Sequence, residues 1–167
     1  MSNIKIEGII SLAETTFIGF EKHQSMGEKF SNVINENYKK LEDLVKSENL
    51  TLKQENFEKS TFCFYYSVNS TDPYMSAFIN AVEVDPSSIS AEKIGSIGLH
   101  IGILPAQKKL LKVIYTGSYE TLGEAWMQAD AFVKENDWVR NSGSLPFERY
   151  VKQDGKNSIT EIYIPIF

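Results

Sequence analysis

The stretch KKLLKVIYTGSYETLGEAWMQADAFVKEND, residues 108–137, decides the fold, because a strand in it leads directly into a helix. Its first part is rich in branched and aromatic residues and ends at Gly117 and Ser118, as is typical of a β-strand that stops at a turn. In its second part apolar residues recur at three- and four-residue spacing, which indicates an amphipathic helix. Ser118 is suited to cap this helix and Glu120 to its first turn. The expected buried stripe comprises Leu122, Ala125, Trp126, Ala129, Phe132 and Val133.

Two strands, FERYV (147–151) and ITEIYIPI (159–166), follow this helix and are joined by the turn KQDGKNS. The first half has the same element order: strand character over 4–20, an amphipathic helix over 26–47, a strand over 61–70, a turn over 69–74 and a strand over 75–84. We therefore predict an α+β fold with pseudo-twofold duplicated βαββ units, halves of about 1–88 and 89–167 in one domain, and the loop DPSSISAEK (85–93) as their boundary. Joined edge to edge, the units would form an antiparallel sheet with two helices on one face and a concave ligand cleft on the other.

The composition excludes several classes of protein. The 167 residues are 42% hydrophobic and 23% charged, with a net charge of -5, so a packed core is expected and a nucleic-acid-binding surface is not. The single cysteine, Cys63, permits no disulfide, and neither metal-ligand spacing nor a dinucleotide-binding glycine motif occurs, so we expect no metal and no cofactor. No signal pattern and no apolar run of membrane-spanning length is found, which predicts a cytoplasmic protein without a membrane partner.

Two glutamates stand among aromatic and apolar residues in the last two strands. Alternation predicts that Glu161 and Tyr163 share one face of their strand and that the isoleucines at 162, 164 and 166 face the helices. By the same reasoning Glu148 and Tyr150 would lie on the open face, with Phe147 and Val151 opposite. A half-buried carboxylate beside tyrosines is suited to bind an aromatic cation or to perform acid–base chemistry. The alternative is that both glutamates lie on a solvated face without a function.

Three segments resemble the GyrI-like small-molecule-binding family, whose domain is also found fused to AraC-type and MerR-type regulators. They are IYTGSYETLGEAW (114–126), PFERY (146–150) and TEIYIPI (160–166), and the likeness is good over 103–167 and faint over 1–85. The resemblance implies a duplicated βαββ fold with a central pocket, in which Glu148 lies at the base and attracts cationic aromatic ligands, while Glu161 and Tyr163 line it. Candidates for the first-half wall are Phe64, Tyr65 and Tyr66, and Trp138 is a candidate for the pocket mouth, although covering the core is its alternative role.

Three functions are consistent with these residues. The first is a stand-alone drug or toxin sensor or sequestering protein, in which Glu148 supplies charge and Tyr150, Tyr163, Tyr66 and Trp138 supply walls. The second is a hydrolase of electrophilic small molecules such as cyclopropane-containing toxins, with Glu148 as acid–base group and Tyr150 orienting substrate or water. The third is a protein-interaction role such as inhibition of DNA gyrase, and a separately encoded regulator is a further candidate partner.

Overall fold

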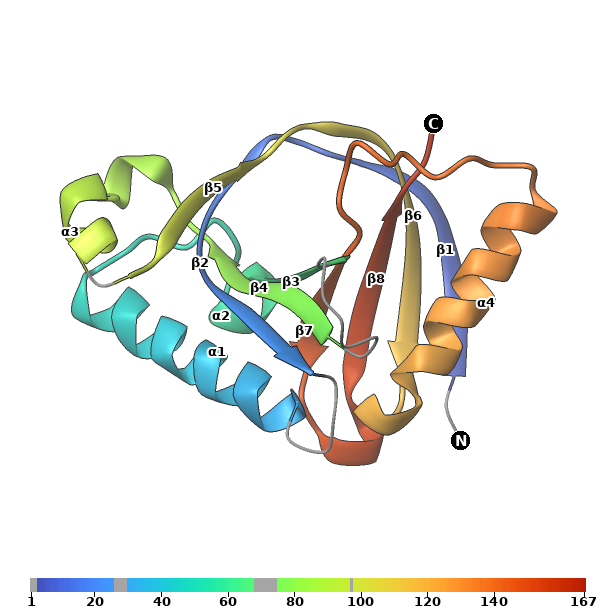
Figure 1. Ribbon diagram of the computed structural model, residues 1–167, viewed down its shortest axis with the longest axis horizontal. Coiled ribbons are helices and arrows are strands. Elements are labelled where there is room, and N and C mark those ends of the chain that lie inside the picture. The colour runs from blue at the N-terminus through green and yellow to red at the C-terminus, as the bar shows by residue number, and fades with distance from the viewer. Residues whose placement is uncertain (1–2, 26–29, 68–74, 97) are drawn as a thin grey trace. The chain divides into compact units, whose positions relative to one another are not determined.

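The computed structural model describes residues 3–25, 30–67, 75–96 and 98–167, and the chain divides into two compact units (Figure 1). Unit 1 comprises Met1–Glu14 and Pro105–Phe167, and unit 2 comprises Thr15–Leu104. The predicted helix start at 26–29 and the whole of the predicted turn at 69–74 lie outside the described residues. Among the helices that are described, none is both long enough and apolar enough to cross a membrane.

Unit 1 contains a four-stranded antiparallel sheet with the strand order β1-β6-β8-β7. Its elements are β1 (Asn3–Leu12), β6 (Gln107–Thr116), the 3₁₀ turn η2 (Tyr119–Thr121), α4 (Leu122–Glu135), β7 (Phe147–Lys152), η3 (Gly155–Asn157) and β8 (Ile159–Pro165). Ser118 caps η2 rather than α4: its hydroxyl accepts a hydrogen bond from the Glu120 amide, and α4 begins one turn later.

Unit 2 contains four further antiparallel strands in the order β3-β4-β2-β5. Its elements are β2 (Thr15–Ser25), α1 (Phe30–Ser47), α2 (Phe57–Ser60), β3 (Thr61–Ser67), β4 (Met75–Glu83), η1 (Pro86–Ser88), α3 (Ala91–Ser96) and β5 (His100–Leu104). The predicted loop at 85–93 is therefore wrong in part, because η1 and the start of α3 lie in it. The side chain of Ile94 is only 1% exposed, and its burial anchors the short helix α3.

The duplication predicted from element order is confirmed, and both units arrange their βαββ strands in the same way. In each βαββ motif the last strand lies between the other two, in the orders β3-β4-β2 and β7-β8-β6. The additional strands are exchanged: β1 precedes β2 in the chain yet pairs with β6, and β5 precedes β6 yet pairs with β2. The compact units are therefore not contiguous halves of the sequence, and the assignment of one domain to residues 1–167 stays a prediction.

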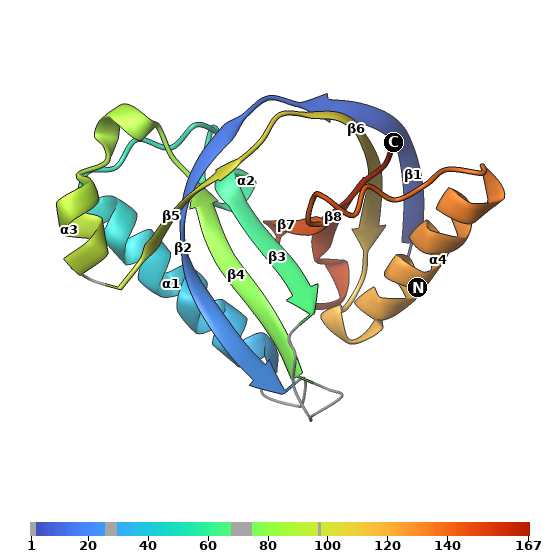
Figure 2. The same cartoon turned by 45° about the horizontal axis from the view of Figure 1, so that its top comes forward.

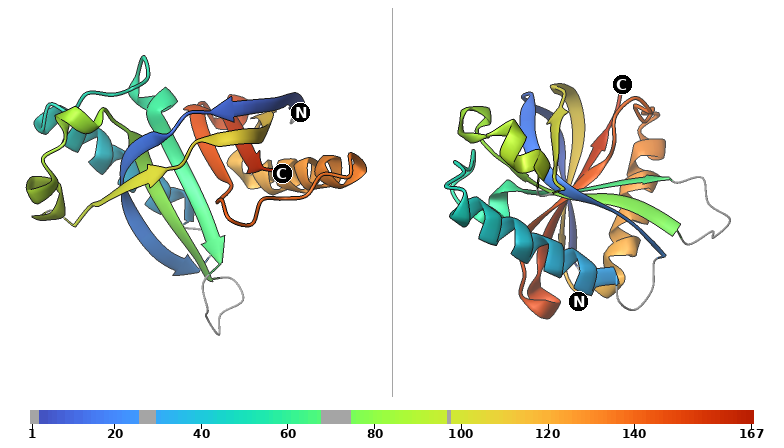
Figure 3. Two further views of the ribbon diagram at one scale, coloured as in Figure 1. Left: turned by 90° about the horizontal axis from the view of Figure 1, so that it is seen from above. Right: turned by 60° about the vertical axis from the view of Figure 1, so that its left-hand side comes forward.

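The helix α1 packs on one face of the unit 2 sheet, as Figures 2 and 3 show. Its buried residues Ile34, Tyr38, Leu41 and Val45 follow the predicted three- and four-residue spacing. Two buried hydrogen bonds fix the helix on the sheet: Tyr38 Oη donates to the Phe62 carbonyl at 2.6 Å, and Asn37 Nδ2 donates to Asn80 Oδ1 at 2.9 Å. The Asn80 amide in turn donates to Cys63 Sγ at 3.4 Å, so these three side chains lie on the α1 side of the sheet.

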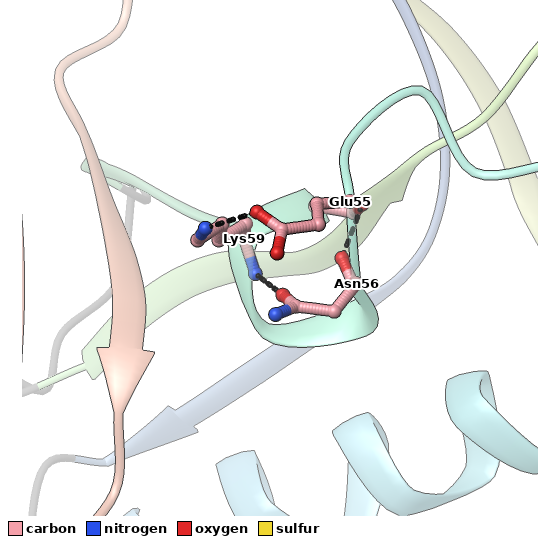
Figure 4. Close-up of polar contacts among 4 residues, drawn as sticks. Glu55, Asn56 and Lys59 are labelled. Carbon is pink, nitrogen blue, oxygen red and sulfur yellow. Dashed lines mark hydrogen bonds and ion pairs between the residues drawn. The ribbon is translucent and has the colours of Figure 1, made fainter.

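The entry into β3 is fixed by the one-turn helix α2 (Figure 4). The Asn56 side chain caps this turn by accepting a hydrogen bond from the Lys59 amide at 2.9 Å. An exposed ion pair between Glu55 and Lys59, at 2.5 Å, closes the same turn and is expected to add little stability because water screens it.

The bond between Asn37 and Asn80 generates a prediction about stability. We expect Asn37→Ala to lower the free energy of unfolding by about 1–3 kcal/mol, because the buried Asn80 carbonyl loses this donor. Asn35→Ala, at an exposed position of the same helix, is the matched control and should change it by less than about 0.5 kcal/mol. Urea unfolding followed by circular dichroism measures both, and equal losses in the two variants would contradict the prediction.

Candidate functional site

Cross-strand pairing determines on which face each glutamate lies, and it places Glu148 and Glu161 on opposite faces of the unit 1 sheet. Glu148 is paired with Ile162, and Glu161 is paired with Arg149. Paired residues share a face, so the prediction that Glu148 and Tyr150 share a face with Glu161 and Tyr163 is wrong. Alternation within each strand is as expected, but the phase between β7 and β8 depends on their pairing, which alternation does not reveal.

The α4 side of the sheet carries Glu148. Trp126 of α4 donates its indole Nε1–H to Glu148 Oε1 at 2.5 Å, which also confirms that Ile162, on the same face as Glu148, lies toward the helix. Phe147, which was expected to face the helix, lies instead on the opposite face, where its ring stacks on Tyr163 with centroids 4.6 Å apart.

Glu148 is a buried carboxylate surrounded by aromatic side chains. Only 2% of its surface is exposed, and its second oxygen accepts a hydrogen bond from Tyr150 Oη at 2.6 Å. Tyr119, in η2, packs edge-on against the Tyr150 ring with centroids 5.5 Å apart. Burial raises the pKa of Tyr119, the nearby Ser158 hydroxyl lowers it, and the charge of Glu148 raises it further. We call Glu148, Trp126, Tyr150 and Tyr119 the Glu148 cluster.

Glu161 lies in a different electrostatic environment, on the face away from α4. Lys112 Nζ forms an ion pair with Glu161 Oε1 at 2.7 Å, and both side chains are largely buried. Tyr163 Oη donates to Glu161 Oε2 at 2.5 Å, and the cations of Lys112 and Arg149 each lie 5.8 Å from the centroid of the Tyr163 ring. The charge of Glu161 is thus compensated by a cation within its own sheet.

Two of the other predicted lining residues, Phe64 and Tyr65, belong to unit 2, and Trp138 belongs to unit 1. Phe64 belongs to unit 2, where it is 2% exposed and packs against Phe62 and Phe17 on the face away from α1. Tyr65 lies on the α1 side of that sheet and packs against Phe78, whereas the side chain of Tyr66 is outside the described part of the structure. Trp138 follows the C-terminal end of α4 and packs edge-on against Phe132, with centroids 5.7 Å apart.

A comparison with protein-family models matches residues 8–166 to the GyrI-like small molecule binding domain. The chain belongs to this family. The matched range covers both units, including the first half, where the sequence likeness is faint. A search of the curated proteins found no match.

Solved structures share the fold of this GyrI-like domain at low sequence identity. The C-terminal domain of EcmrR has a TM-score of 0.68 and 19% identity, with 100% of this chain and 97% of that chain covered. EcmrR in a complex with DNA has a TM-score of 0.72 and 18% identity over 99% of this chain, which spans only 57% of the length of that protein. SAV2435 bound to tetraphenylphosphonium has a TM-score of 0.63 and 14% identity, with 95% of this chain and 92% of that chain covered.

Trp126, like Tyr119, is a residue of the Glu148 cluster that sequence reasoning missed in this GyrI-like domain. Its position on the apolar stripe of the helix predicted a core role, yet its side chain is only half-buried and hydrogen-bonds Glu148. The signal available in the sequence was the indole itself, because a buried indole N–H usually requires an acceptor. Among the described residues, no three His, Cys, Asp or Glu side chains are grouped so that they could hold a metal ion.

The hydrogen bond from Trp126 generates a prediction. We expect Trp126→Phe to lower the free energy of unfolding by about 1–2 kcal/mol, because the buried Glu148 oxygen loses a donor while the aromatic packing is largely kept. Trp138→Phe removes the same atoms from a half-buried indole that packs on Phe132, and a loss of about 0.5 kcal/mol is expected. Chemical denaturation at neutral pH measures both, and a Trp126→Phe loss no larger than that of the control would contradict the role of the bond.

The pKa of Tyr163 predicts the alkaline stability of the domain. Burial is the largest cause that raises this pKa, and the hydrogen bond to the Glu161 carboxylate and the charge of Glu161 raise it further. Below pH about 10 both the folded and unfolded states keep the tyrosine proton, so stability is unaffected. Above pH about 10 the unfolded chain loses its proton while the folded chain retains it, so the free energy of unfolding should fall by up to about 1.4 kcal/mol per pH unit.

The measurement is urea unfolding between pH 8 and pH 11.5 on the parent protein and on Tyr163→Phe. Between pH 10 and pH 11.5 the free energy of unfolding should fall less steeply with pH in the variant than in the parent protein. This comparison of slopes does not depend on the stability of the variant at pH 8. Parallel curves for the two proteins would show that Tyr163 does not titrate as its surroundings indicate.

Proposed function

We propose that this GyrI-like domain binds hydrophobic, cationic aromatic small molecules at the Glu148 cluster, as a sensor or sequestering domain for drugs or toxins. The observation that carries the proposal is the burial of the Glu148 carboxylate among aromatic side chains. Trp126 and Tyr150 both donate hydrogen bonds to it, which favours its charged form. A ligand cation near this carboxylate would gain an attraction that is strengthened by the low polarity of the surroundings.

The aromatic surroundings of Glu148 favour the same kind of ligand. Aromatic faces attract cations and stack against flat apolar groups, whereas a small hydrated cation gains less from leaving water. Trp126 and Tyr119 are the half-exposed members of the cluster, so we expect a ligand to meet them first. The solved structure of SAV2435 with tetraphenylphosphonium, a cation with four phenyl groups, supports this class of ligand for the fold.

Glu161 is the weaker candidate for the recognition charge. Its ion pair with Lys112 and the neighbouring Arg149 make the surroundings of Tyr163 cationic overall. A cationic ligand would have to compete with Lys112 for this carboxylate, and it would be repelled by both basic residues. We therefore assign the charge recognition to Glu148, on the α4 side of unit 1.

The test is isothermal titration of the intact chain with tetraphenylphosphonium. We expect Glu148→Gln to weaken binding roughly ten- to hundredfold, because the substitution keeps the shape of the side chain and removes its charge. Glu161→Gln is the matched control and should change the affinity less than threefold. The neutral triphenylphosphine oxide should bind both variants and the parent protein alike.

Two outcomes would contradict the proposed function. One is saturable phosphonium binding that is unchanged in Glu148→Gln. The other is a larger loss in Glu161→Gln than in Glu148→Gln, which would move the recognition charge to the other face of the sheet.

A further inference from the structure

Two hydroxyl groups beside Glu148 have unusual surroundings. Thr160 Oγ1 and Tyr119 Oη are both buried, and neither has a hydrogen-bond partner within the part of the chain that the structure describes. Thr160 as a whole is 0% exposed. Buried polar atoms in native proteins nearly always have a partner, so two unpartnered hydroxyls in one small region require an explanation.

Both hydroxyl-bearing residues adjoin Tyr150. Thr160 is the direct cross-strand partner of Tyr150 on one side and of Tyr115 on the other, so the three side chains share the α4 face of the sheet. Tyr119 reaches the same place from η2, where its ring meets the edge of the Tyr150 ring. The two hydroxyls therefore belong to the surroundings of the carboxylate and not to a remote part of the core.

The neighbouring tyrosines direct their protons elsewhere. Tyr150 Oη donates to Glu148, and Tyr115 Oη lies 2.8 Å from the Ser118 carbonyl and 2.5 Å from Thr121 Oγ1. A phenol has one proton to donate, so neither tyrosine serves as a donor to Thr160 in this arrangement.

The Ser158 hydroxyl lies near Tyr119, but its own proton is donated to another group. It donates to the Gly155 carbonyl at 2.8 Å and accepts from the Asp154 amide at 2.9 Å. Ser158 is near enough to lower the pKa of Tyr119, yet the two hydroxyls do not meet at hydrogen-bond geometry.

We propose that the hydroxyls of Tyr119 and Thr160 form a polar subsite beside Glu148, which hydrogen-bonds a neutral group of the ligand such as a hydroxyl, amide or ether. This inference rests on the proposed function, and it narrows the ligand class to aromatic cations that also carry a neutral hydrogen-bonding group. Packing does not require a hydroxyl at position 160, because valine has the same branched shape. The hydroxyl lowers the stability of the empty protein, and a polar ligand group would satisfy it.

The test compares ligands that differ by one polar group. Tetraphenylphosphonium is titrated beside its 3- and 4-hydroxymethyl derivatives, in which one phenyl ring carries a neutral hydroxyl. At least one derivative should bind the parent protein roughly three- to tenfold more tightly than the unsubstituted cation, as expected for one added hydrogen bond. Thr160→Val and Tyr119→Phe should each reduce this advantage, and Thr160→Val should leave the affinity for tetraphenylphosphonium within about twofold.

Thr116→Val is the matched control, because Thr116 lies on β6 with its side chain on the opposite face of the same sheet. It should leave the advantage unchanged. Thr160→Val should also melt no lower than the parent protein in the absence of ligand, since it removes an unpartnered buried hydroxyl.

The inference is overturned if neither derivative binds more tightly than the unsubstituted cation, or if the advantage persists in both Thr160→Val and Tyr119→Phe. These outcomes are distinct from failure of the proposed function, which shows as phosphonium binding that does not depend on Glu148. A lower melting temperature for Thr160→Val together with an unchanged ligand preference would assign Thr160 a structural role.

Discussion

The pairing of β7 with β8 is the constraint on which the site depends. Because Glu148 is opposite Ile162, the carboxylate is directed toward α4 and not toward the other face of the sheet. The burial of that carboxylate then requires donors, and α4 provides one in Trp126, while Tyr150 provides the other from two residues along the same strand. A shift of one residue in this pairing would move Glu148 to the face that carries Lys112 and Tyr163 and would move Arg149 to the α4 face.

The two faces of the unit 1 sheet therefore carry carboxylates with different chemistry. On the face away from α4, Glu161 lies in a network with Lys112, Tyr163 and Arg149. Burial, followed by the hydrogen bond to Glu161 and its charge, raises the pKa of Tyr163, whereas Arg149 lowers it. On the α4 face, Glu148 is held by neutral aromatic donors. A network of paired charges of this kind usually has a structural role, whereas the proposed role of Glu148 is to recognise a ligand cation.

The exchange of β1 and β5 shows how the duplicated chain is organised. Each βαββ unit obtains its fourth strand from the segment that precedes the other unit in sequence, and both fourth strands pair antiparallel with the first strand of the unit they join. This arrangement makes residues 1–14 a structural part of the unit that carries the Glu148 cluster. It also explains why a division of the sequence near residue 88 does not correspond to the compact units.

The sequence by itself determined the α+β class and the repeated strand–helix–strand–strand order, and it indicated Glu148 and Tyr150 as candidate site residues. Helical spacing and strand alternation are local properties, and the likeness of PFERY and TEIYIPI to GyrI-like domains supplied the rest. Only the tertiary structure decided the phase between neighbouring strands, the exchange of β1 and β5 and the contact of Trp126 with Glu148. Each of these depends on which distant segments pair, and the free energy of pairing is gained across the fold and not within a window of sequence. For that reason the sequence predicted Trp126 to be a core residue, whereas α4 brings its indole to the Glu148 carboxylate. It also predicted that Glu161 and Glu148 share a face, whereas the sheet places them on opposite faces.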